Sequence, residues 1–197
     1  MRSLIHTATT AAAAAVLGIA GAVWAVPDVT NVQMSQRANS RWVDITYSLS
    51  GEEAIVTLGI ETNGVALPDG AVTRLSGDVC KRVSMGTDKH IAWNAGADWP
   101  ENVAANAKAR VTAWVTNAPP QVMVVDLSKG TAATAQDPYP VYYYVSVDAL
   151  PYGGLTNEVY KTEYLVLRKL PAGLFSMGEG SGSVAVTLTQ DFYAGVF

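Results

Sequence analysis

The sequence predicts a mainly β protein, with a β-sandwich of the immunoglobulin or fibronectin type followed by further β-rich segments. Apolar and polar residues alternate with a period of two in several segments, which is typical of strands that bury one face. These segments recur about every ten residues, with Gly, Asn and Asp between them, as in sandwich domains. No amphipathic helix of useful length is found between residues 29 and 116.

The strands expected in the sandwich cover, in order, residues 29–34, 42–49, 54–61, 90–93 and 109–116. The second has the clearest alternation, with Val43, Ile45, Tyr47 and Leu49 on one side. The Asn63-Gly64 pair after the third strand suits a tight turn with positive φ. Residues 98–108 are expected to hold one short turn of helix.

Pro119 and Pro120 follow the predicted sandwich domain, residues 26–117. Two prolines remove two backbone donors and stiffen a linker, so they are typical of a domain boundary. Beyond them, residues 118–170 form a β-rich lead-in segment, with strands expected over residues 122–127, 141–147 and 164–170. Alternation returns near the end of the sequence, over residues 184–189.

The first 25 residues have the three parts of a secretory signal peptide. Arg2 supplies the positive charge, residues 11–24 form an uncharged apolar run, and the residues around Ala25 suit cleavage after it. The run is shorter than the roughly 20 residues that span a bilayer, which favours a cleaved signal over an uncleaved anchor. We therefore expect export to the periplasm, the cell surface or the medium, with no membrane span left in the mature chain.

The charge and the cysteine content exclude some classes of function. Cleavage removes Arg2 and no carboxylate, which leaves 12 Lys and Arg against 17 Asp and Glu, a net charge of −5. This balance does not favour nucleic acid or an anionic membrane face, both of which select for basic surfaces. Cys80 is the only cysteine, so the chain cannot form an internal disulfide.

The last part of the sequence carries two linked motifs. Residues 171–178 have the pattern Pro-x-Gly-x-Phe-x-Met-Gly, and residues 192–195 have the pattern Phe-Tyr-x-Gly. Together they resemble the opening of the formylglycine-generating enzyme (sulfatase-modifying factor) domain, and residues 122–128 and 139–143 resemble the lead-in found in exported bacterial members. The matching positions are Gly173, Phe175, Met177, Gly178, Phe192, Tyr193 and Gly195.

The resemblance implies that residues 171–197 are the first strands of such a domain, truncated near its start. A whole member of this family is a cysteine-oxidising enzyme or a binding scaffold, and its full domain uses copper and calcium. The family's catalytic cysteine pair lies near the far end of its domain, and no position here matches it. We therefore expect no catalytic residue, cofactor or metal site in this chain.

The alternative function is a complete secreted binding module for a carbohydrate or a surface protein partner. Trp93, Trp99 and Trp114 are the candidate sugar platform, although core packing is the more common use of tryptophan in a sandwich. Three consecutive tyrosines, residues 142–144, must split between the two faces of their strand, so at least one ring is expected to be exposed or covered by a neighbouring domain.

Other chemistry-bearing residues favour structural roles. Cys80 as a nucleophile would need a placed base, and His90 is the only histidine left after cleavage. Two such residues cannot supply the three or four ligands of a zinc site. The carboxylate pairs Glu52–Glu53 and Asp98–Glu101 suit solvated turns better than acid–base catalysis. Residues 178–182 are glycine-rich but lack the Lys-Ser/Thr of a phosphate-binding loop.

Overall fold

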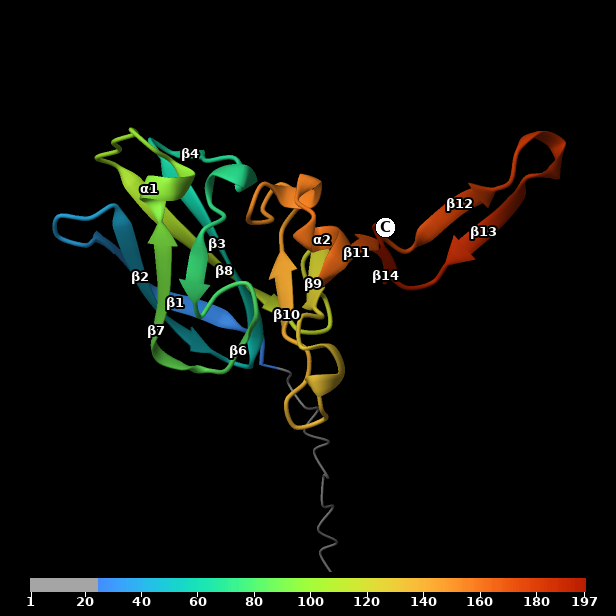
Figure 1. Cartoon of the computed structure of the whole chain (residues 1–197), viewed down its shortest axis with the longest axis horizontal. Coiled ribbons are helices and arrows are strands. Elements are labelled where there is room, and N and C mark those ends of the chain that lie inside the picture. The colour runs from blue at the N-terminus through green and yellow to red at the C-terminus, as the bar shows by residue number, and fades with distance from the viewer. Residues whose placement is uncertain (1–24) are drawn as a thin grey trace, which may run out of the picture.

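The protein is described by a computed structural model that covers residues 25–197. The predicted signal peptide, residues 1–25, lies outside the described residues except for Ala25. The prediction of a mainly β chain is confirmed, because antiparallel strands dominate and each described helix has four residues or fewer. Figure 1 shows a larger β unit, a smaller one beside it, and a hairpin that extends away from both.

The first unit contains two antiparallel sheets. One sheet has the order β1-β2-β7-β5, formed by Asp28–Gln36, Trp42–Ser50, Gly86–Asn94 and Leu75–Gly77. In the other, β3 pairs with β8 on one edge and with the short strands β4 and β6 on the other; these are Ala54–Thr62, Ala107–Val115, Val65–Ala66 and Arg82–Val83. A 3₁₀ turn, η1 (Asp69–Ala71), and a short α-helix, α1 (Ala95–Asp98), lie in the connections between these strands.

The two sheets share one hydrophobic core, and the sequence alternation explains why. The four apolar positions of β2 are all buried, whereas the residues between them are half-buried. They pack against Ala54, Val56, Leu58 and Ile60 of β3 and against Ile91 and Trp93 of β7. Burial of this apolar surface is the main favourable term in folding a chain that has no disulfide.

The second unit is a separate four-stranded antiparallel sheet with its own small core. Its order is β10-β9-β11-β14, formed by Val141–Tyr144, Val122–Asp126, Tyr164–Leu170 and Phe192–Gly195. The helix α2 (Val159–Thr162) and the 3₁₀ turns η2 (Gly130–Ala132) and η3 (Gly154–Thr156) lie in its loops. Its core residues are Val122, Val124, Leu150, Tyr160 and Val166. One core therefore gives way to the other between Val115 and Val122.

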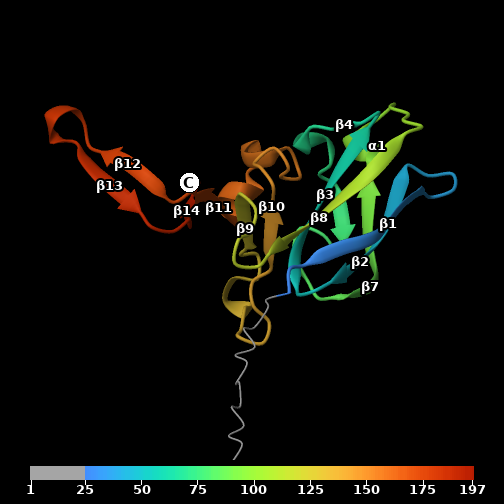
Figure 2. The ribbon, with the colours of Figure 1, turned by 180° about the vertical axis from the view of Figure 1, so that it is seen from behind.

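The hairpin consists of β12 (Gly173–Met177) and β13 (Val184–Leu188), joined through η4 (Gly180–Gly182). It forms a two-stranded sheet of its own and projects from the body, as both ribbon views show (Figures 1 and 2). After it, β14 returns to pair with β11. Residues 118–170 and the last strand therefore share one sheet.

Several local expectations were wrong. The helical turn expected within residues 98–108 lies earlier, at α1, because the Asn94 side chain accepts a hydrogen bond from the Ala97 amide (3.1 Å) and starts the helix there. The strand expected over residues 141–147 ends at Tyr144. Pro120, where one core gives way to the other, is fully buried, and Pro119 is half-buried.

Candidate functional site

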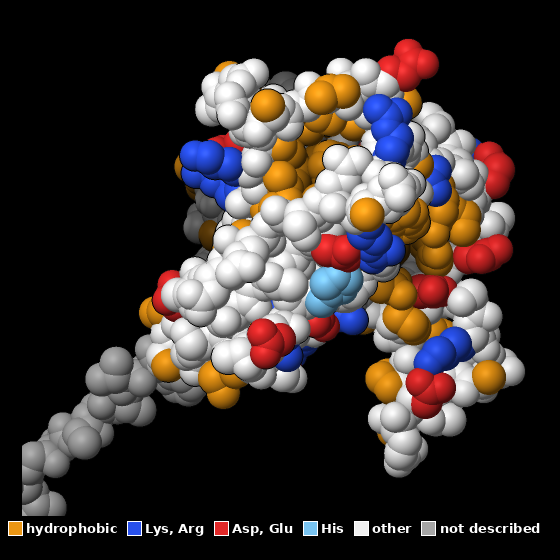
Figure 3. Space-filling model, turned by 90° about the vertical axis from the view of Figure 1, so that its left-hand side faces the viewer, with side chains coloured by type: hydrophobic (Ala, Val, Ile, Leu, Met, Phe, Trp, Pro, Cys, Tyr) orange, Lys and Arg blue, Asp and Glu red, His pale blue; other side chains and the backbone are white. Residues whose placement is uncertain are grey.

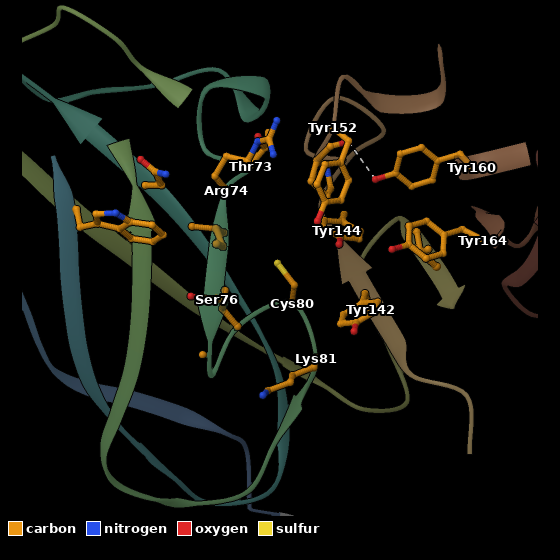
Figure 4. Close-up of a pocket in the computed structure, with 17 residues that line it drawn as sticks. Thr73, Arg74, Ser76, Cys80, Lys81, Tyr142, Tyr144, Tyr152, Tyr160 and Tyr164 are labelled. Atoms are coloured by element: carbon orange, nitrogen blue, oxygen red, sulfur yellow. Dashed lines mark hydrogen bonds between the residues drawn. The ribbon is translucent and has the colours of Figure 1, made fainter. Parts of the chain in front are cut away.

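A cleft of about 540 Å³ lies between the two units. Residues 73–81 of the first unit form one wall, and residues of β10, the 151–164 region and β9 form the other. Figure 4 shows Thr73, Arg74, Ser76, Cys80 and Lys81 on the side of the cleft opposite the tyrosines. Its volume falls within the roughly 300–1,000 Å³ typical of small-molecule sites.

The first wall is held by a carboxylate clamp. The Oδ2 atom of Asp98 accepts hydrogen bonds from the amides of Thr73 (2.7 Å) and Arg74 (2.6 Å) and from Nε1 of Trp93 (2.9 Å). Its Oδ1 atom accepts from the Thr73 hydroxyl at 2.8 Å. Asp98 therefore fixes the loop before β5, and this loop places Arg74 at the cleft.

Cys80 belongs to the first wall and has a structural role there. Its amide donates to the Val56 carbonyl (2.7 Å), and its carbonyl accepts from the Tyr143 amide (2.8 Å). The protein packed around its sulfur raises the pKa of Cys80 to about 12, so the thiolate that a nucleophile needs is scarce at neutral pH. His90 does not approach it, because the imidazole bonds to Asp44 on another face.

Tyrosine rings dominate the second wall. Tyr142 and Tyr144 face the cleft, whereas Tyr143 between them is buried on the opposite side of β10 at 6% exposure. The expectation that this run splits between two faces is thus confirmed. Tyr160 and Tyr164 add a T-shaped pair with ring centroids 5.3 Å apart. Burial raises the pKa of Tyr144, so this phenol stays neutral and remains a hydrogen-bond donor.

Within the described residues, two direct hydrogen bonds join the two units that carry the walls. One is the main-chain bond from Tyr143 to Cys80, and the other joins the Ser146 hydroxyl to Oδ2 of Asp69 at 2.6 Å. In addition, Ile55 of β3 is fully buried although it lies outside the main core, where β10 approaches β3. The cleft therefore lies between two anchored surfaces.

The candidate tryptophan platform is not assembled. Trp93 is only 3% exposed and belongs to the core, and Trp114 donates its Nε1–H to the Thr57 hydroxyl at 2.9 Å. Trp93 and Trp99 do line one separate cavity of about 360 Å³, but Trp114 does not reach it. Core packing therefore accounts for Trp93 and, in part, for Trp99, which packs against the same core, whereas Trp114 is half-buried and bonds to Thr57.

His90 lies in a surface charge network on β2 and β7. Its Nε2 is 2.7 Å from Oδ1 of Asp44, and Arg37 donates to both oxygens of that carboxylate at 2.7 Å. Figure 3 shows this histidine exposed between acidic and basic side chains. The Arg37 guanidinium lowers the pKa of Asp44 to about 2. Among residues 25–197, no three His, Cys, Asp or Glu side chains gather as metal ligands would.

The seven positions singled out by the two sequence motifs occupy the hairpin and β14. Gly178 has φ +101°, and a Cβ there would lie 3.1 Å from the Gly182 carbonyl oxygen, so the hairpin turn requires glycine. Tyr193 of β14 donates its hydroxyl to the Pro120 carbonyl. Asp191 joins the two motifs, because it accepts from the Ala172 amide (2.8 Å) and pairs with Lys169 (3.1 Å).

Compared with known proteins, the chain matches no family model, no curated protein and no solved structure at a significant level. In the part of the chain that the structure describes, no helix is long and apolar enough to cross a membrane.

The sequence pattern did not indicate the cleft. Its walls come from segments more than forty residues apart, and Arg74, Tyr152, Tyr160 and Tyr164 belong to no recognisable motif. The one available signal was the concentration of tyrosines in a single segment, since seven of the nine lie within residues 139–164.

Proposed function

We propose that this chain is the exported, non-catalytic N-terminal part of a formylglycine-generating-enzyme-like protein. Residues 26–117 would be an immunoglobulin- or fibronectin-like sandwich, residues 118–170 the lead-in, and residues 171–197 the opening of the family's domain. The observation that carries the proposal is the hairpin β12–β13, which holds the first motif and has no protein packed against it in the described structure.

The two faces of this hairpin differ in polarity. The pairing of Phe175 with Val186 and of Met177 with Val184 places these four apolar side chains on one face. The opposite face carries Leu174, Ser176, Ala185 and Thr187. Phe175 is 42% exposed and Met177 61% exposed. An isolated two-stranded hairpin is at best marginally stable in water, so an apolar face of this kind is typical of an element that packs against further structure.

The closure at Asp191 supports the same assignment. Its bonds to Ala172 and Lys169 bring the first and last residues of the motif region together at the base of the hairpin. Tyr193 then anchors β14 to the second unit through Pro120. The two motifs thus form one compact element that leads away from the body, as the opening of a further domain would.

The family assignment is tested by the genomic DNA beyond the codon for Phe197. An open frame that encodes a further domain with a cysteine pair near its far end supports the proposal, and its absence from all three frames overturns it. The role of the hairpin is tested by sedimentation of the mature chain over a range of concentrations. We expect self-association that a Phe175→Ser/Met177→Ser variant reduces, whereas Leu174→Ser on the opposite face has little effect. Equal behaviour of both variants would contradict an apolar docking face.

A second candidate function is a secreted binding module, and the tyrosine-lined cleft is the specific observation that favours it. The cleft lies wholly within the first and second units and includes no residue of the hairpin. Binding there is compatible with either role of residues 171–197. The decisive measurement is ligand binding to the mature chain from which residues 173–188 have been replaced by Gly-Gly, which joins Ala172 to Thr189 and leaves β14 in place. Binding that requires the hairpin would contradict this candidate.

A further inference from the structure

The cleft has several aromatic hydroxyls with no hydrogen-bond partner among residues 25–197. Five tyrosines line it, Tyr142, Tyr144, Tyr152, Tyr160 and Tyr164. Only the Tyr160 hydroxyl makes a hydrogen bond within residues 25–197, to the Pro151 carbonyl at 3.1 Å. Figure 4 shows the hydroxyl ends of Tyr160 and Tyr164 directed toward the opposite wall. A phenol both donates and accepts, so the cleft suits a ligand that is rich in hydroxyl groups.

The charge of the cleft is of one sign. Arg74 and Lys81 line it, and no aspartate or glutamate does. Within the described residues, neither cation forms an ion pair through its side chain. The Arg74 guanidinium lies 4.9 Å from the ring centroid of Tyr152, which orients it without neutralising it. An anionic group is therefore favoured here although the chain as a whole is acidic.

Two residues of the cleft adopt unfavourable backbone conformations. Tyr152 has φ +61° and Cys80 has φ +56°. Left-handed backbone is tolerated by asparagine and aspartate but is costly for larger side chains, and such residues cluster at binding sites. Gly77 adds a close approach, because a Cβ there would lie 2.3 Å from the His90 carbonyl oxygen. The surrounding hydrogen bonds hold this geometry in place, so the site is preformed.

We propose that this cleft binds an acidic carbohydrate, an oligosaccharide that contains hexuronic acid. The C–H faces of the sugar rings would stack on the tyrosines, ring hydroxyls would bond to the phenols, and a carboxylate would bind Arg74. A neutral sugar would leave the cations unused, and an acidic peptide without aromatic residues has no rigid ring faces to stack on the tyrosines. This proposal rests on the binding-module function and names the ligand of that module. It is independent of the family assignment of residues 171–197.

The test is titration calorimetry of the mature chain, at low salt, with a tetramer of α-1,4-linked galacturonic acid. Maltotetraose serves as the neutral ligand of equal length, hexaglutamate as the acidic peptide, and free galacturonic acid distinguishes a monosaccharide site from an oligosaccharide site. We expect the uronate tetramer to bind at least about tenfold more tightly than the others, and 0.5 M NaCl to weaken it. Equal binding of maltotetraose, tighter binding of hexaglutamate, or no binding of the tetramer would overturn the proposal.

Matched variants locate the site. Arg74→Gln removes the cation but keeps the backbone bond to Asp98, and we expect it to weaken uronate binding about tenfold or more. Tyr144→Phe removes one hydroxyl and keeps the ring, with an expected loss of about fivefold. Arg168→Gln is the control, because Arg168 is exposed on β11, outside the cleft. Unfolding curves that match the parent protein show that each variant is folded. Equal losses for Arg74→Gln and Arg168→Gln would refute the site.

Discussion

Replacement of Asp98 gives the most direct test of how the cleft wall is held. Three hydrogen bonds converge on its Oδ2 atom and one on Oδ1, from the Thr73 amide and hydroxyl, the Arg74 amide and the Trp93 indole. Asp98→Ala leaves all four donors without an acceptor. Asp98→Asn keeps an oxygen where three of them converge, and its amide group can donate to the Thr73 hydroxyl, which can also accept.

The size of the two effects follows from the types of bond lost. A hydrogen bond to a charged group contributes about 1.5–3 kcal/mol, and a buried donor left unpaired costs about 1–3 kcal/mol. Because the four bonds share one acceptor group, their losses do not add. We therefore expect Asp98→Ala to lower the free energy of unfolding by about 3–5 kcal/mol. Asp98→Asn should lower it by about 1–2 kcal/mol, since it loses the charge but keeps the geometry.

The assay is urea unfolding of the mature chain, followed by tryptophan fluorescence, which reports on Trp93 in the core of the first unit. Asp28→Ala is the control, because this side chain is exposed and makes no hydrogen bond or ion pair with the other residues that the structure describes; its effect should stay within about 0.5 kcal/mol. The reasoning is refuted if Asp98→Ala is no more destabilising than Asp28→Ala, or if Asn and Ala at position 98 have the same effect.

Three further outcomes can be measured on the same protein. Because burial raises the pKa of Cys80 to about 12, the native thiol should react with a disulfide reagent at pH 8 far more slowly than the urea-unfolded thiol, and equal rates would contradict this. The pKa of Asp44 is lowered to about 2 in the folded state, below its unfolded value, so its stabilising effect exists above about pH 4 and disappears as the pH falls toward 2. The free energy of unfolding of Asp44→Asn should therefore be lower than that of the parent at pH 7 and equal to it at pH 2. The same difference at both pH values would refute this reasoning. Tyr193→Phe removes the hydroxyl that bonds to Pro120 and should destabilise the second unit by about 1 kcal/mol, seen as faster amide exchange in β14; unchanged exchange would count against this bond.

The longer strands could be predicted from the sequence because each has a consistent burial pattern. Val43 and Ile45 alternate with wetter residues along β2, and the β-branched run of β3 lies in the middle of its sheet. The short strands β4, β5 and β6 could not be predicted, since two or three residues are too few to show a period. Their positions depend on pairing with longer neighbours.

The candidate site depends on tertiary structure and for that reason escaped prediction. The splitting of the tyrosine run was predictable from strand geometry, but which face would meet another surface was not. Arg74 is placed by Asp98 across 24 residues, and Tyr152 meets Arg74 only because the second unit folds back on the first. Trp93 was ambiguous for the same reason, since a core tryptophan and a ligand platform have the same local sequence.

The burial of Pro120 has a consequence for motion between the two units. Pro119 and Pro120 both offer their carbonyls to the second unit, to Lys169 and Tyr193, so they move with it. The pivot is thereby confined to the few residues between Val115 and Pro119. Within the described residues, the two hydrogen bonds between the units, from Tyr143 to Cys80 and from Ser146 to Asp69, both oppose rotation about so short a pivot. The spacing between the two walls is therefore fixed before any ligand arrives, and binding need not spend free energy on bringing the walls together.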